Sequence, residues 1–104
     1  MAQFDVYLNP NAATRNVIPY LLDVQADLLD SLATRVVVPL VLAEKMGLTA
    51  KYLNPKFNVN GMMVVMSTAE LAGISSRSVG EQVTSLKDKR NENITALDLL
   101  FAGI

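Results

Sequence analysis

Three aspartates are the closest group of residues that could do chemistry together. Asp23, Asp27 and Asp30 are separated by four and three positions, so on a helix their carboxylates would share one face and could hold a cation. The residues before them have a strand pattern, which does not favour such a face. We therefore interpret the three aspartates as solvated acids or turn-forming residues, and we expect no metal site and no cofactor.

The residue types that are missing narrow the chemistry further. The chain has no cysteine and no histidine, so it can form neither disulfides nor thiolate metal sites, and it lacks the commonest general base. Any catalysis would fall to carboxylates, hydroxyls or arginine. There is also no phosphate-binding glycine loop, Ser/His/Asp set or zinc spacing. We expect no catalytic residues and predict that the protein is not an enzyme.

Length and composition indicate one small domain with apolar surface to spare. The 104 residues predict a single domain over 1–104, and 51% of them are hydrophobic, so a homodimer is the simplest partnership. A net charge of −1 with interspersed signs argues against direct nucleic-acid binding. The longest apolar run, Val36 to Ala43, is far shorter than the roughly 20 residues of a membrane span, and no signal segment is evident. We expect a cytoplasmic protein without a membrane segment.

The element best able to position a site is a helix predicted over the last twenty residues, Ser85 to Ile104. Ser85 followed by Asp88 is similar to a capping box, and Gly103 would end the helix. At about 100° per residue, one apolar stripe should face the core. The stripe comprises Leu86, Ile94, Leu97 and Phe101, with Leu100 at its edge.

The same periodicity separates a second face of this helix from the core stripe. Asp98 and Ala102 lie one turn apart on it, with Asn91 and Thr95, while Leu99 points to a third side. Asp98 carries a negative charge, which the helix dipole disfavours in the last turn of a helix. This second face is therefore either solvated or part of a binding surface.

Short strands account for the first half of the chain. Alternation predicts strands at Phe4 to Leu8 and Pro19 to Gln25. The β-branched run from Val36 to Leu42 is the best candidate for a central strand, although Pro39 within it implies a bulge or a missing ladder hydrogen bond. In Asp27-Leu28-Leu29-Asp30, neither helical nor strand periodicity would bury both leucines. One of them should therefore be exposed.

A hairpin is predicted from Phe57 to Met66, because Asn60-Gly61 can supply the two positive φ angles of a type I′ turn. Its methionines, at 62, 63 and 66, could form an adaptable binding surface, but we prefer the interpretation that they fill the core. The stretch from Thr68 to Gly80 has no clear period, and Gly80 to Val83 would lead into the final helix. About five antiparallel strands and one helix make a mainly β or α+β, barrel-like domain.

Four strings carry a resemblance to a known family. They are Asp23-Val24-Gln25-Ala26-Asp27-Leu28-Leu29-Asp30, Arg35-Val36-Val37-Val38-Pro39-Leu40, Gly80-Glu81-Gln82-Val83 and the C-terminal Phe101-Ala102-Gly103-Ile104. In order, spacing and total length they closely resemble the CcdB toxin family, from Gln3 to the last residue. The loop at residues 9 to 17 and the hairpin match poorly.

The resemblance implies an SH3-like barrel with a C-terminal helix, a fold shared with the MazF and Kid ribonuclease toxins. It implies the toxin half of a type II toxin–antitoxin module, a poison that binds the A subunit of DNA gyrase, traps the cleaved-DNA complex and is neutralised by a CcdA-like antitoxin. It also implies a two-fold dimer through the helix ends. The dimer residues would be Leu99, Leu100, Gly103 and Ile104.

Carried over by position, the family's gyrase-facing isoleucine pair becomes Leu28 and Leu29, and its C-terminal Gly-Ile is Gly103 and Ile104. Two positions depart from the family. Asp98 replaces an asparagine, and Ala102 replaces the tryptophan that stacks on gyrase arginines. Three hypotheses follow: a weakened or retargeted gyrase poison, a non-toxic homologue that binds antitoxin as a dimer, and a MazF-like endoribonuclease.

Overall fold

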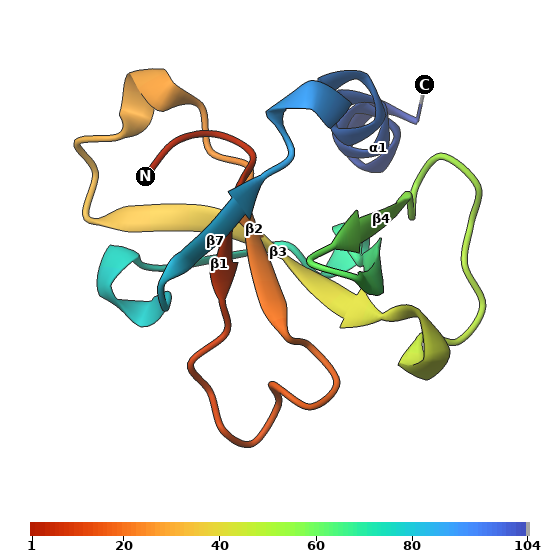
Figure 1. Cartoon of the computed structure of the whole chain (residues 1–104). Coiled ribbons are helices and arrows are strands. Elements are labelled where there is room, and N and C mark those ends of the chain that lie inside the picture. Colours follow the sequence, from red (N-terminus) through yellow and green to blue (C-terminus); the bar gives the residue numbers. More distant parts are fainter. Residues whose placement is uncertain (104) are drawn as a thin grey trace.

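Seven strands form one curled antiparallel sheet in the computed structural model, which describes residues 1–103 (Figure 1). One α-helix, α1, follows the strands within these residues. The strands are β1 (Asp5–Leu8), β2 (Tyr20–Asp23), β3 (Thr34–Leu42), β4 (Lys56–Val59), β5 (Met62–Met66), β6 (Ala72–Ser75) and β7 (Gln82–Ser85). The helices are α1 (Arg90–Ala102) and five single 3₁₀ turns, η1 (Asp27–Leu29), η2 (Ala43–Lys45), η3 (Thr68–Glu70), η4 (Ser76–Ser78) and η5 (Lys87–Lys89).

The central strand is β3, as its β-branched run predicts. The sheet order is β4-β5-β3-β2-β1-β7, and β6 also pairs with β3. The barrel-like, mainly β architecture with a C-terminal helix is thus confirmed, but the expected number of about five strands is wrong. Strands β6 and β7 escape prediction, because each has only four residues and neither alternates cleanly between apolar and polar residues.

Of the two alternatives expected at Pro39, a bulge is not found, and the structure instead has a position without a ladder partner for the proline nitrogen. Pro39 pairs in register with Leu21 of β2. On the other side of β3, the residues paired with β6 end at Val37 and those paired with β5 begin at Leu40. Pro39 therefore lies in the gap between two partner strands, where its missing N–H leaves no ladder hydrogen bond unmade.

The predicted hairpin is confirmed at its turn. Asn60 has φ 51° and Gly61 has φ 86°, the two positive angles of a type I′ turn, between the paired residues Val59 and Met62. Of the three methionines, Met66 is fully buried, whereas Met62 and Met63 are 37% and 47% exposed. The expectation of core filling was wrong for these two, because the first half of β5 extends beyond the core.

The final helix begins at Arg90, not at Ser85. Ser85 belongs to β7, which pairs with β1, so tertiary pairing overrides the helical pattern in this stretch. Ser85 Oγ accepts a hydrogen bond from Lys87 N at 3.2 Å instead of capping α1. Gly103 does end the helix, with φ 73° and its N–H bonded to Leu99 O at 3.0 Å. No helix in residues 1–103 has the length and apolar character needed to cross a bilayer.

The face of α1 that meets the core is centred differently from the predicted stripe. Asn93 and Ala96 are fully buried. Ile94 and Leu97 pack beside the core as half-buried residues, but Phe101 is 71% exposed. The predicted stripe was wrong at Phe101 because Asn93, a polar residue, takes a core position. There its Nδ2 donates a hydrogen bond to Leu86 O at 3.2 Å.

Gly80 is required where the chain after η4 crosses β1. Its N–H donates to Leu8 O at 2.8 Å, and a Cβ at this position would lie 2.8 Å from Leu8 O and 2.9 Å from Leu8 Cβ. Gly80→Ala should therefore lower the free energy of unfolding by about 1–3 kcal/mol, because backbone must move. Urea titration would measure this change. Gly47→Ala, whose Cβ would meet nothing within 4 Å, is the matched control, and an equal loss in both variants would contradict the steric explanation.

Candidate partner-binding surface

The leucine pair lies on the single turn η1. Leu28 is 91% exposed and Leu29 is 46% exposed, so both leucines reach solvent where one was expected to. The turn is closed by Leu29 N donating to Ala26 O at 2.9 Å and Asp30 N donating to Asp27 O at 3.1 Å. Exposed neighbouring leucines on a closed turn form an apolar projection suited to a partner's pocket.

A buried glutamine fixes this turn to the sheet. Gln25 is 6% exposed. Its Nε2 donates to Leu29 O at 2.8 Å, and its Oε1 accepts from Val36 N at 3.0 Å. Through these two bonds, the backbone of the leucine turn is held against β3.

A buried ion pair lies in the sheet beside this glutamine. Asp23 and Arg35 are 0% and 1% exposed, and both Nε and Nη2 of Arg35 donate to Asp23 Oδ2. Burial raises the pKa of the Asp23 carboxyl above its ordinary value, against the opposing effect of the hydrogen bonds from Arg35 and the Gln25 backbone. The interpretation of Asp23 as a solvated acid or turn residue was therefore wrong. The available signal was Asp23 inside one predicted strand, Pro19 to Gln25, and Arg35 directly before another, Val36 to Leu42.

The other two aspartates are at the turn itself. Asp27 and Asp30 are exposed, and Asp27 Oδ1 accepts a hydrogen bond from Gln3 N at 2.7 Å. These positions agree with the interpretation as turn-forming residues. Among residues 1–103, no group of three or more acidic side chains is placed to hold a metal ion.

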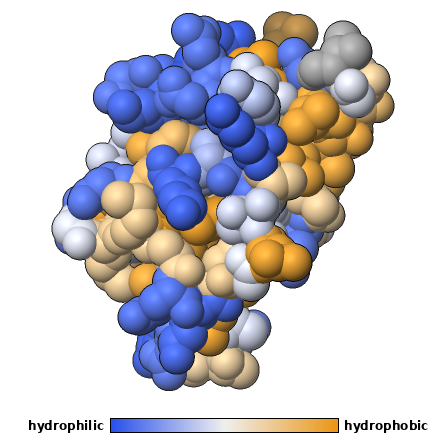
Figure 2. All heavy atoms as spheres, turned by 90° about the vertical axis from the view of Figure 1, so that its right-hand side faces the viewer, coloured by the Kyte–Doolittle hydropathy of each residue, from blue (hydrophilic) through white to orange (hydrophobic). Residues whose placement is uncertain are grey.

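The end of α1 forms a second exposed patch. Asp98, Ala102 and Gly103 are exposed, and Leu99 and Leu100 are half-buried. Figure 2 shows hydrophobic surface at the upper right of its view. Asn91 and Thr95 are also exposed, so the second face of the helix is open to solvent along its length. Ile104, expected in both the partner and the dimer surface, lies outside the described residues.

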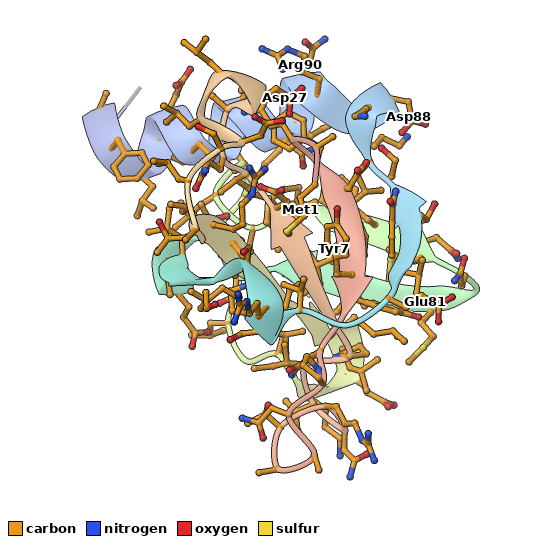
Figure 3. All side chains as sticks on the ribbon, turned by 90° about the vertical axis from the view of Figure 1, so that its left-hand side faces the viewer. Met1, Tyr7, Asp27, Glu81, Asp88 and Arg90 are labelled. Atoms are coloured by element: carbon orange, nitrogen blue, oxygen red, sulfur yellow. The ribbon has the colours of Figure 1, made fainter. Side chains whose placement is uncertain are left out.

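The leucine turn and α1 lie at the same end of the barrel, η1 towards the left and α1 towards the right in Figure 1. The N-terminal segment connects them. Gln3, which bonds Asp27 in η1, accepts from Arg90 Nη1 at 3.1 Å through its Oε1, and Figure 3 shows Asp27 and Arg90 close to each other at the top of the molecule. The structure thus links the leucine turn to the start of α1, while the patch with Asp98 and Ala102 lies towards the other end of the helix.

The comparisons with known proteins agree with this architecture. A solved structure described as "Endoribonuclease in complex with its cognate antitoxin from Mycobacterial species" has a TM-score of 0.74 over 96% of this chain and 93% of that chain, at 13% sequence identity. At that identity, the likeness shows a shared fold. The family match over residues 3–103 places the protein in the toxin class of type II toxin–antitoxin proteins, and the shared fold agrees with it. Residues 3–103 match the family described as CcdB protein, and the chain belongs to this family.

Proposed function

We propose that this protein is a toxin that binds the A subunit of DNA gyrase, traps the cleaved-DNA complex and is neutralised by a CcdA-like antitoxin in the cytoplasm. The observation that carries the proposal is the exposed leucine pair on η1, at the positions of the family's gyrase-facing isoleucines. The proposed gyrase surface comprises Leu28, Leu29, Asp98, Ala102, Gly103 and Ile104. Such a toxin needs no catalytic group, because it acts by binding alone.

The two departures at the helix end weaken this activity in the proposal. Asp98 and Ala102 are both exposed on α1, so they remain available to a partner. Ala102 offers no ring for stacking on an arginine. Asp98 keeps an acceptor but lacks the amide donors of asparagine.

Expressing the toxin alone in cells with wild-type gyrase and in cells whose gyrase carries a resistant variant tests the proposal. Growth should slow only with wild-type gyrase. The double variant Leu28→Ala/Leu29→Ala should lose this effect without unfolding, because both side chains are exposed. Leu48→Ala, at a fully exposed leucine outside the proposed surface, is the matched control and should inhibit growth like the wild type. Equal inhibition in both strains would contradict gyrase as the target.

The fold of the solved neighbour supports a second candidate, an endoribonuclease. This chain has no histidine, so cleavage would require carboxylates, hydroxyls or arginine as acid–base groups. Incubation of the purified protein with RNA distinguishes the candidates, since a gyrase poison leaves RNA intact. A protein inert in both assays that still binds antitoxin would be the non-toxic homologue.

We expect an isologous homodimer formed through Leu99, Leu100, Gly103 and Ile104. Leu99 and Leu100 are only half-buried within one chain, and a two-fold contact between helix ends would cover them. Light scattering at micromolar concentration should give twice the 11.3 kDa of one chain. Leu99→Glu should shift the mass towards the monomer, and a monomeric wild type would contradict the prediction.

The antitoxin should contribute a flexible, acidic segment that becomes ordered on binding. We propose that it lies along the surface with Leu28, Leu29 and the end of α1, so that neutralisation and gyrase binding exclude each other. Calorimetry with the C-terminal segment of the cognate antitoxin measures this binding directly.

A further inference from the structure

A hollow of about 380 Å³ lies between α1 and the loop that precedes β4. Figure 1 shows this loop rising along the right-hand side of the molecule towards α1, and Figure 2 faces that side. Tyr52 and Pro55 line the hollow from the loop, and three residues line it from the helix: Asn91, Glu92 and Thr95. We call this feature the Tyr52 hollow.

The aromatic ring in this hollow is exposed, and the loop that carries it is held in place. Tyr52 is 62% exposed and has φ 70°, a left-handed conformation that residues other than glycine rarely adopt. Asn54 braces the loop around it. Its Oδ1 accepts from Ala50 N at 2.9 Å, and its Nδ2 donates to Met66 O at 3.0 Å. Backbone strain that presents an exposed ring, rather than burying it, is typical of a binding site.

The charged side chains around the Tyr52 ring indicate which ligand would bind there. Lys51 Nζ lies 5.0 Å from the centre of the Tyr52 ring, so the ring already attracts a cation within its own loop. Glu92 lines the opposite wall, and among residues 1–103 neither Glu92 nor Asp98 takes part in an ion pair. An aromatic face opposite an unpaired carboxylate suits a guanidinium group, which can stack on a ring and donate hydrogen bonds to a carboxylate at the same time.

We propose that the Tyr52 hollow receives an arginine side chain of the antitoxin segment, an inference that rests on the proposed function. The helix-lining residues Asn91 and Thr95 belong to the same exposed face as Asp98 and Ala102. From Ala102 to Asn91 this face is about 16 Å long, which about five extended residues span. A flexible segment seated on the helix end can therefore follow this face into the hollow.

Calorimetry with a synthetic peptide of the cognate antitoxin's C-terminal segment tests the proposal. Tyr52→Ala and Glu92→Gln should each weaken binding about five- to thirtyfold, the range of a partly desolvated cation–π contact or ion pair. Tyr52→Phe keeps the ring and should bind like the wild type, as should the control Leu48→Ala. Replacing the arginines of the peptide by citrulline, one at a time, should cause the same loss of affinity at one position. At that position, combining citrulline with Tyr52→Ala should weaken binding no further than either change alone.

The outcomes separate this inference from the proposed function. If the wild type binds the peptide and folded Tyr52→Ala and Glu92→Gln bind it equally well, the assignment of the hollow is wrong while the antitoxin partnership stands. If the wild type does not bind the peptide, the assignment of the hollow and the antitoxin partnership are both contradicted. If Tyr52→Ala loses gyrase binding but keeps peptide binding, the hollow belongs to the gyrase contact and the assignment to the antitoxin fails.

Discussion

Replacing Ala102 by Trp should strengthen binding to DNA gyrase by about 30- to 1000-fold, the reverse of the ~2–4 kcal/mol commonly lost when an interface tryptophan is truncated. The position tolerates the larger side chain because Ala102 is exposed at the end of α1, so no core packing has to change. Growth inhibition and gyrase-mediated DNA cleavage should increase together. Affinity is measured with the purified A subunit of gyrase.

Asp98→Asn is the second step of this experiment. It restores the amide donors with little change in volume, and the double variant should inhibit at least as strongly as Ala102→Trp alone. Leu48→Trp, at an exposed site outside the proposed surface, controls for a non-specific effect of an added ring. A wild type that already poisons gyrase as strongly as Ala102→Trp would show that Leu28, Leu29 or Leu99 carries the contact. A folded but inert double variant would favour the non-toxic homologue.

Arg35→Met should lower the free energy of unfolding by about 3–5 kcal/mol, a large part of the stability of a domain this size. The reason is the partner left behind, since the Asp23 carboxylate is fully buried and would have no compensating cation. The double variant Asp23→Leu/Arg35→Met should recover most of the loss. The pair is incompletely satisfied, because Arg35 Nη1 has no hydrogen-bond partner among residues 1–103, and apolar replacement of such pairs is often neutral.

The pH dependence of Arg35→Met provides an internal check. The pKa of Asp23 is already raised in the folded protein by burial, and removal of Arg35 should raise it further. A group whose pKa is higher in the folded state stabilises that state at low pH, and this contribution is lost as pH rises through the folded pKa. The destabilisation by Arg35→Met should therefore be smaller in acid than at neutral pH. Urea titrations at both pH values measure this, and a loss independent of pH would mean that Asp23 is not the cause.

The parts of the fold that local patterns determine could be predicted from sequence. The β-branched run of β3 and the Asn60-Gly61 turn are examples, because burial on both faces and positive φ angles leave direct marks on residue type. The extents of β7 and α1 could not be predicted. Ser85 has a good local reason to begin a helix, and only its pairing with Asp5 in β1 places it in a strand.

The exposure of some residues of the candidate site was predictable in the same way. Two leucines between acids indicated exposure, and the structure shows both of them in solvent. Gln25, which holds this turn, and Arg35, which pairs with Asp23 in the sheet, were missed because their roles depend on burial. Tyr52 was missed as well, since a left-handed φ in a tyrosine leaves no signal in the sequence.

The pairing of β1 with β7 also bears on how the protein is made. These strands lie near opposite ends of the chain, at Asp5–Leu8 and Gln82–Ser85. During synthesis from the N-terminus, β1 therefore waits for its neighbour until most of the chain has left the ribosome. Contacts between such distant segments form slowly, so the edge of β1 that pairs with β7 stays open until then. A nascent chain thus lacks both the pairing of β1 with β7 and the helix α1 until the last part of the chain has been made, so the proposed partner surface on α1 forms late.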